Sequence, residues 1–202
     1  LQYAEFMAMT GSQAKDVQTV LEKGLAASPT SLPVRLALVR LLVQSGDAKR
    51  ALSLSQEAAA TAPDEPAVLD LLGRSQVAAG EMQQALATYG KLAARVPSSP
   101  IPLIAMADLM MSSKDTAGAE QNLRKALAIK PDSLEAQQRL VAVLLNDKRG
   151  DAAIAISKDV QRQRKDLAIG YVLEAESLLA IGKRVEAVKL YEEAYKREKS
   201  PA

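Results

Sequence analysis

The residues best suited to acid–base chemistry are two pairs of neighbouring carboxylates, Asp64 with Glu65 and Glu192 with Glu193. Neighbours on a helix point about 100° apart, so the members of each pair do not share one site. We interpret them as helix caps or solvated charges. The chain contains no Cys, His or Trp, which excludes thiol nucleophiles, imidazole bases, disulfides and the usual zinc ligands. We therefore expect no enzymatic activity, no metal and no cofactor.

A second group with chemical potential is the basic cluster of Lys158, Arg162, Arg164 and Lys165 at the end of a predicted helix. These cations could bind phosphate, or they could complement the negative end of the helix dipole, and the capping role is favoured because no glycine-rich phosphate loop is present. Across the chain, 26 Lys and Arg residues are nearly balanced by 24 Asp and Glu residues. This balance gives no electrostatic reason to expect nucleic acid or anionic lipid as a partner.

The elements that position these residues follow from an internal repeat. Pro29, Pro63, Pro97 and Pro131 are each 34 residues apart, and Gly46 and Gly80 share the same spacing. An independent column of small residues has the same 34-residue period and consists of Ala51, Ala85, Ala119, Ala153 and Ala187. Such a period is typical of a repeat architecture, and 202 residues correspond to about six units.

Each unit has the pattern of two amphipathic helices separated by a short break. In residues 66–97, Pro66 fits a first helical turn, and Asp64 is a candidate N-cap. Apolar residues then recur three and four apart until Gly80, where a left-handed conformation can end the helix. A second apolar face follows and ends before Pro97, because proline disfavours helical geometry in the residue before it.

These residues resemble the tetratricopeptide repeat (TPR) family, whose pattern is W-x2-L-G-x2-Y, then A-x3-F, then P. The best match is formed by Leu69, Leu72 with Gly73, Ala85, Tyr89 and Pro97. The chain departs from this pattern at several positions. It has no Trp, Gln76 replaces the Tyr, and Ser55 and Ser157 replace the large aromatic residue. Lys165 stands where a fifth proline would fall. The resemblance implies an all-α, right-handed superhelical solenoid of helix-turn-helix repeats. We expect one array, 1–202, with units 1–31, 32–65, 66–99, 100–133, 134–167 and 168–201, excised from a longer array.

The alanine column has a structural interpretation. Ala51, Ala85, Ala119, Ala153 and Ala187 are expected where two helices cross closely, so that a larger side chain would overpack the contact. A single unit cannot bury its apolar face alone, and stacking of the units would create a long concave surface.

The first helix of each unit is expected to line that concave surface. Arg40, Arg74, Asp108 and Glu176 recur at multiples of the period, and the apolar or acidic neighbours expected around them are Leu36, Val43, Asp70, Leu71, Val77, Ile104, Met111, Leu145, Val172 and Leu179. Two interpretations stay open: these side chains only pack the solenoid, or they form a channel for a peptide in which Arg40 and Arg74 bind an acidic group. The Lys/Asn-rich clamp with which chaperone-binding TPR domains hold a terminal carboxylate does not occur here.

A narrower resemblance concerns the large TPR lipoproteins of bacterial PEP-CTERM and exopolysaccharide loci. It rests on residues 69–74, 159–165, 170–174 and 182–184. It implies a periplasmic scaffold whose parent protein is tethered to the outer membrane, although a cytoplasmic location stays open. No apolar run approaches the roughly 18 residues needed to span a bilayer, so we expect no membrane insertion of this segment.

The sequence thus predicts a non-catalytic scaffold that binds a protein or peptide in its concave groove, in bacterial envelope exopolysaccharide or protein-sorting assembly. One alternative is a TPR targeting arm of a larger enzyme such as a glycosyltransferase. Another is self-association through the terminal repeats, around Tyr191 and Tyr195.

Overall fold

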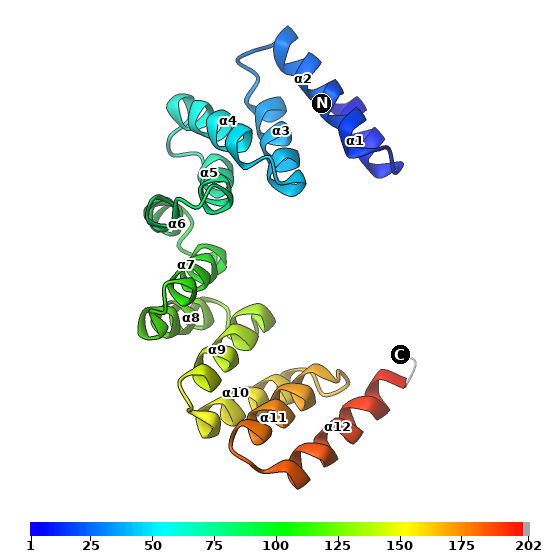
Figure 1. The fold of residues 1–202 in the computed structure, drawn as a ribbon, viewed down its shortest axis with the longest axis vertical. Coiled ribbons are helices and arrows are strands. Elements are labelled where there is room, and N and C mark those ends of the chain that lie inside the picture. The colour runs from blue at the N-terminus through cyan, green and yellow to red at the C-terminus, as the bar shows by residue number, and fades with distance from the viewer. Residues whose placement is uncertain (200–202) are drawn as a thin grey trace. The chain divides into compact units, whose positions relative to one another are not determined.

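The computed structural model describes residues 1–199, which form twelve helices and no strand (Figure 1). The helices fall into two compact units of three repeats each, residues 1–97 and residues from 98 onward. From here on, "unit" means one of these two parts, and "hairpin" means one repeat. The first unit consists of α1 (Gln2–Met9), α2 (Ala14–Ala27), α3 (Leu32–Ser45), α4 (Ala48–Thr61), α5 (Pro66–Ala78) and α6 (Met82–Arg95). The second unit consists of α7 (Ile101–Ser112), α8 (Thr116–Ile129), α9 (Leu134–Asn146), α10 (Gly150–Gln163), α11 (Ile169–Ala180) and α12 (Arg184–Lys199).

The helices pair as hairpins: α1 packs on α2, α3 on α4, and so on to α11 on α12. One hairpin falls within each of the six predicted repeats, and the all-α fold of helix-turn-helix repeats is confirmed. The last predicted residues of the sixth repeat, 200 and 201, lie outside the described residues. Within each unit, the second helix of a hairpin packs on the first helix of the next, as α4 does on α5 and α10 on α11.

The turn within five of the hairpins has one left-handed residue at the same place in the repeat. Gly46, Gly80 and Gly182 have φ values near +80°, as predicted for Gly80. The equivalent residues of the fourth and fifth hairpins are Lys114 and Lys148, with φ values of 65° and 59°. A left-handed lysine is strained, because its Cβ approaches the following carbonyl. The turn geometry is therefore retained even where glycine is missing.

Side-chain caps fix the starts of several helices. Asp47 accepts a hydrogen bond from the Arg50 amide at the start of α4, and Asp115 accepts one from the Gly118 amide at the start of α8. The predicted cap by Asp64 is wrong. Glu65 is the N-cap residue of α5 and makes no side-chain cap, whereas the Asp64 carboxylate forms a 2.6 Å ion pair with Arg95 on α6.

Each unit has its own apolar core. In the first unit, Leu38 and Leu42 of α3 pack with Val17 and Leu21 of α2. In the second unit, Leu123, Leu140 and Leu144 form the centre of a larger cluster. All five alanines of the 34-residue column are fully buried. No described helix is both long and apolar enough to cross a bilayer.

Candidate functional site

The predicted groove residues of the first unit lie on α3 and α5. Arg40, Arg74 and Val77 are exposed, whereas Leu36, Val43 and Asp70 are half-buried. Arg40 and Arg74 occupy equivalent positions of two hairpins whose first helices, α3 and α5, are in contact. This surface can therefore present two guanidinium groups and several aliphatic side chains to a ligand.

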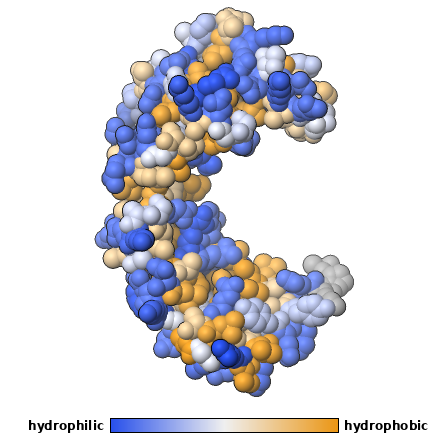
Figure 2. Space-filling model, in the orientation of Figure 1, coloured by the Kyte–Doolittle hydropathy of each residue, from blue (hydrophilic) through white to orange (hydrophobic). Residues whose placement is uncertain are grey.

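The predicted groove residues of the second unit lie on α7, α9 and α11. Asp108, Glu176 and Leu179 are exposed, and the half-buried members are Met111, Leu145 and Val172. Figure 2 shows hydrophobic residues at the surface of the part of the chain that contains α9–α12. The exposed charges predicted for the groove are acidic in this unit and basic in the first.

Two predicted groove residues do not line a surface. Leu71 on α5 and Ile104 on α7 each have only 3% of their area exposed. Ile104 packs with Ala136 and Leu140 of α9 in the core of the second unit. The buried and exposed faces of α7 are hard to separate by sequence, because residues 101–107 contain no charged side chain. Both residues support the fold and are removed from the candidate binding surface.

Some of the charged side chains predicted for the groove form ion pairs within the protein. The Arg74 Nε lies 2.9 Å from the Asp70 carboxylate, and the Arg139 Nε lies 2.7 Å from Asp108. Arg139 was not among the predicted residues. It lies on α9, 31 residues after Asp108 on α7, and these two first helices of adjacent hairpins are in contact. The side chains of Arg40 and Glu176 have no hydrogen bond or ion pair with any residue whose side chain the structure describes.

Arg40 lies at a cavity of about 160 Å³ formed by α1, α2 and α3. The cavity is lined mainly by aliphatic side chains and has Glu5 and Arg40 as its only charged residues; the complete lining is Leu1, Ala4, Glu5, Ala8, Val17, Leu21, Ala37, Arg40, Leu41 and Gln44. Sites that enclose a whole small molecule usually measure roughly 300–1,000 Å³. This cavity is therefore of a size for a single apolar side chain. Helical periodicity does not reveal this cavity, because three of its lining residues are alanines, Ala4, Ala8 and Ala37, whose small side chains leave the space unfilled.

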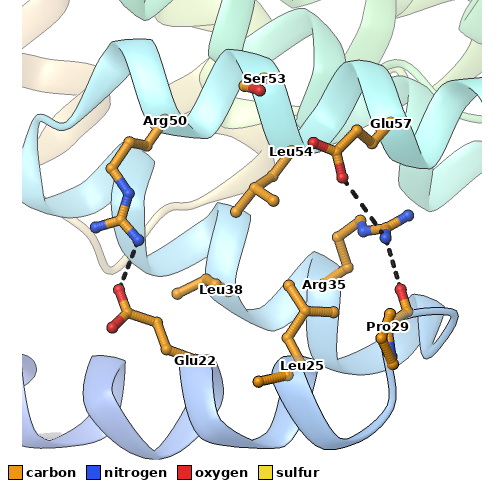
Figure 3. A pocket seen from close by; sticks show the side chains of 10 residues that line it. Glu22, Leu25, Pro29, Arg35, Leu38, Arg50, Ser53, Leu54 and Glu57 are labelled. Carbon is orange, nitrogen blue, oxygen red and sulfur yellow. Dashed lines mark hydrogen bonds and ion pairs between the residues drawn. The ribbon is translucent and has the colours of Figure 1, made fainter.

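A second cavity, of about 450 Å³, lies between α2 and α4 with α3 beneath it (Figure 3). Its charges compensate one another: Arg50 lies 2.6 Å from Glu22, and Arg35 lies 3.6 Å from Glu57. Hydrogen bonds from Gln18 and Arg50 lower the pKa of Glu22. Arg35 also donates a 2.6 Å hydrogen bond to the carbonyl of Pro29. The Arg50–Glu22 pair joins α4 to α2 and so links two hairpins, whereas the Arg35–Glu57 pair lies within the hairpin of α3 and α4.

The basic cluster of the second unit is also engaged within the protein. Lys158 lies 3.6 Å from the buried Glu174, and Arg162 pairs with Asp159. Arg164 donates to the Gln137 side chain at 3.2 Å and to the carbonyl of Asp132. Lys158 therefore links α10 to α11, Arg162 pairs within α10, and Arg164 holds the turn before α9. Among the described residues, no cluster of acidic side chains could hold a metal ion.

Comparison with known families decides what this arrangement of hairpins is. The sequence pattern of the tetratricopeptide repeat matches residues 8–75 and 110–172. The chain belongs to the tetratricopeptide repeat family. No curated protein matches the sequence of this TPR chain.

Solved structures share the TPR fold at low sequence identity. A tetratricopeptide repeat protein from Parabacteroides merdae ATCC 43184 is 17% identical with a TM-score of 0.78, over 100% of this chain and 79% of that one. MamA is 18% identical with a TM-score of 0.69, over 83% and 92% of the two chains. YrrB, described as a TPR protein with an unusual peptide-binding site, is 15% identical with a TM-score of 0.63, over 88% and 91%. These likenesses show the fold.

The departures from the TPR pattern have local structural solutions. The Gln76 side chain, at the place of an aromatic residue, accepts a 2.8 Å hydrogen bond from Thr88. Tyr171 occupies the place of the missing Trp in the last hairpin and lies 3.8 Å from the Arg197 guanidinium. Arg197 also donates to the carbonyl of Lys165, the residue that replaces the fifth proline. Polar contacts thus take over the role of the missing aromatic and proline residues.

Proposed function

We propose that the first unit binds a protein segment in which a bulky apolar side chain lies beside an acidic group. The observation that carries the proposal is the combination of Arg40 with the adjoining cavity. Arg40 is exposed and has no intramolecular partner among the described side chains, while an aliphatic cavity of about 160 Å³ opens beside it. A side chain placed in that cavity would bring the neighbouring part of the ligand within reach of the guanidinium.

The chemistry of the site favours a peptide over a small metabolite. Arginine binds carboxylates through two parallel hydrogen bonds, which gives the contact direction as well as strength. Burial of a Leu, Met or Phe side chain contributes about 1.5–3 kcal/mol. Glu5, on the α1 wall of the same cavity, can accept a hydrogen bond from a backbone amide. Apolar groove residues on α3 and α5, including the half-buried Val43 and the exposed Val77, would extend the contact along the ligand.

Replacement of Arg40 by Ala is expected to weaken peptide binding about 10- to 100-fold, because a hydrogen bond to a charged group contributes about 1.5–3 kcal/mol. Randomised peptides displayed on phage would first be selected against the purified chain. We expect them to share an apolar residue next to Asp or Glu. Their affinities for the variants would then be measured by isothermal titration calorimetry, with circular dichroism as the test of folding.

The matched control is Arg74→Ala, the same change at the equivalent position of the next hairpin. Arg74 already pairs with Asp70 at 2.9 Å, so its loss should reduce affinity much less than the loss of Arg40. Equal losses for both variants, or selected peptides with neither an apolar nor an acidic pattern, would show that the cavity at Arg40 is not the binding site.

The narrower resemblance supports a cellular setting for this scaffold. We propose that the parent protein acts in the bacterial envelope, where it holds proteins of exopolysaccharide assembly or protein sorting. The support is the likeness of residues 69–74 and 159–165 to lipoproteins of those loci. An epitope-tagged parent protein should then fractionate with the outer membrane and become accessible to protease once the outer membrane is permeabilised. Recovery in the cytosolic fraction would instead favour the targeting arm of a cytoplasmic enzyme.

A further inference from the structure

A further cavity, of about 420 Å³, lies in the second unit beside the end of α10 and the start of α11. The side chains that line it are Lys158, Gln161, Arg162, Lys165 and Tyr171. Three of them are cations, and none of the described residues that line the cavity is acidic. The cavity is therefore positively charged, although the charges of the whole chain are nearly balanced.

The first unit has a cavity at the same place of the repeat. Each residue that lines the cavity beside α10 lies four periods of the repeat after a residue that lines the cavity between α2 and α4 (Figure 3). These equivalents are Glu22, Leu25, Ala26, Pro29 and Arg35. In the first unit, the two charged members of this set form ion pairs with residues of α4. The packing of hairpins thus creates the same cavity in both units, and the residues of each repeat decide what it can bind.

Two cations of the cavity beside α10 replace residues that four other repeats share. Arg162 stands where those repeats have alanine, and Lys165 stands where they have proline. The alanines are Ala26, Ala60, Ala94 and Ala128, and the prolines are Pro29, Pro63, Pro97 and Pro131. The repeats with alanine and proline form the same kind of hairpin. The fold of a hairpin therefore requires neither cation.

The three cations of this cavity have weak partners or none within the protein. Lys165 is exposed, and its amine has no hydrogen bond or ion pair with any side chain that the structure describes. Arg162 pairs with Asp159, but the two side chains are 72% and 41% exposed, and such surface pairs contribute little stability. Lys158 lies 3.6 Å from Glu174, which is longer than a direct hydrogen bond. All three can therefore donate to a ligand.

The negative end of the α10 dipole is the feature that opposes an anion at this place. It amounts to roughly half an elementary charge. Part of it is already compensated, because the Val160 carbonyl accepts a 2.9 Å hydrogen bond from the Arg164 amide. The Lys165 carbonyl accepts a 3.1 Å hydrogen bond from Arg197, whose guanidinium lies 3.8 Å from the centre of the Tyr171 ring. The full charges of the three lining cations outweigh what remains.

The donors of the cavity fit a phosphate group better than a carboxylate. A phosphate monoester has a charge of about −1.5 to −2 at neutral pH and three acceptor oxygens, whereas a carboxylate has one charge and two oxygens. Arginine and lysine are the usual partners of phosphate oxygens. The cavity is also large enough for an organic group beyond the phosphate, since sites for small molecules measure roughly 300–1,000 Å³. Tyr171 and Gln161 offer that group an aromatic surface and an amide.

We propose that this cavity binds a small organic phosphate monoester. Lys158, Arg162 and Lys165 hold the phosphate oxygens, and the organic part of the ligand lies against the Tyr171 ring. The site belongs to the second unit and does not depend on peptide binding at Arg40. The chain thus has two recognition sites of different chemistry, one in each unit.

Isothermal titration calorimetry of the purified chain tests the proposal with glucose 6-phosphate, phenyl phosphate and inorganic phosphate as probes. We expect one site per chain and weaker binding of inorganic phosphate, which lacks the organic part. Arg162→Ala and Lys165→Gln should each weaken binding of the esters about 10-fold or more, because each removes a charged hydrogen-bond donor. Arg162→Ala restores the alanine of four other repeats, so its circular dichroism should be unchanged.

The matched control is Lys130→Gln, which removes an exposed cation at the end of α8 and should leave the affinity unchanged. The proposal is overturned if neither ester binds, or if Lys130→Gln weakens binding as much as Lys165→Gln does. Inorganic phosphate that binds as tightly as both esters would show a site for a bare anion. A phosphoserine peptide that binds more tightly than both esters would show a site for a phosphorylated protein instead of a small molecule.

Discussion

Ala119→Leu is expected to lower the free energy of unfolding by about 1–3 kcal/mol, because it forces extra carbon atoms into a closed helix crossing. Ala119 on α8 is fully buried and lies in the core cluster with Leu123 and Leu140. Its neighbours already fill the space around its methyl group. For a chain of this size, a loss of that magnitude corresponds to a fall in Tm of about 2–12 °C.

The same substitution at Ala85 tests the first unit independently. Ala85 is also fully buried, on α6. Thermal unfolding followed by circular dichroism would measure both variants, with Arg74→Ala as the surface control. Arg74 takes part only in an exposed pair with Asp70, and such pairs contribute about 0–1 kcal/mol. Leucine variants no less stable than the Arg74 variant would contradict the assignment of the alanine column to close packing.

Gly170→Ala is expected to destabilise the second unit strongly, although alanine normally favours a helix. A Cβ atom on Gly170 would lie 2.6 Å from the backbone nitrogen of Gln161 and 2.9 Å from its Cα. These are backbone atoms of α10, so no side chain can rotate to make room. The two helices must move apart, and the 3.2 Å hydrogen bond from the Gln161 side chain to the Gly170 carbonyl is weakened.

Gly90→Ala is the matched control for Gly170→Ala. Gly90 lies within α6, and a Cβ atom there would meet nothing within 4 Å. This variant should gain about 0.5–1 kcal/mol from the smaller conformational entropy of alanine in the unfolded chain. Chemical denaturation of both variants would measure changes of opposite sign. A stabilised Gly170 variant would show that α10 and α11 are not as closely packed as the structure places them.

Most of the local structure was predictable from the repeat. The 34-residue spacing of Pro29, Pro63, Pro97 and Pro131 predicts the ends of hairpins, since proline interrupts the helix before it. The left-handed turn at Gly80 was predicted from glycine alone. The same turn at Lys114 and Lys148 was not, because lysine gives no local signal for positive φ and adopts it only where the flanking helices impose it.

The candidate binding site was only partly predictable. Helical periodicity placed Arg40, Arg74, Asp108 and Glu176 on one exposed face, and all four are exposed. It could not reveal that Asp70 and Arg139 hold two of these charges, because ion pairs depend on side-chain placement. It also placed Leu71 and Ile104 on the wrong side, since a helix that is apolar on several faces gives a weak signal for which face is buried.

Sequence alone determined that this protein is an array of helical hairpins, because the hydrophobic period, the alanines and the helix-ending prolines are local and repeat along the chain. The tertiary structure alone decided which charged side chains of the array are paired and where a cavity forms beside them. The cavity beside Arg40 and the ion pairs that hold Arg74 and Asp108 depend on the spacing of neighbouring helices. That spacing is set by the fit of many side chains at once, which no single position in the repeat records.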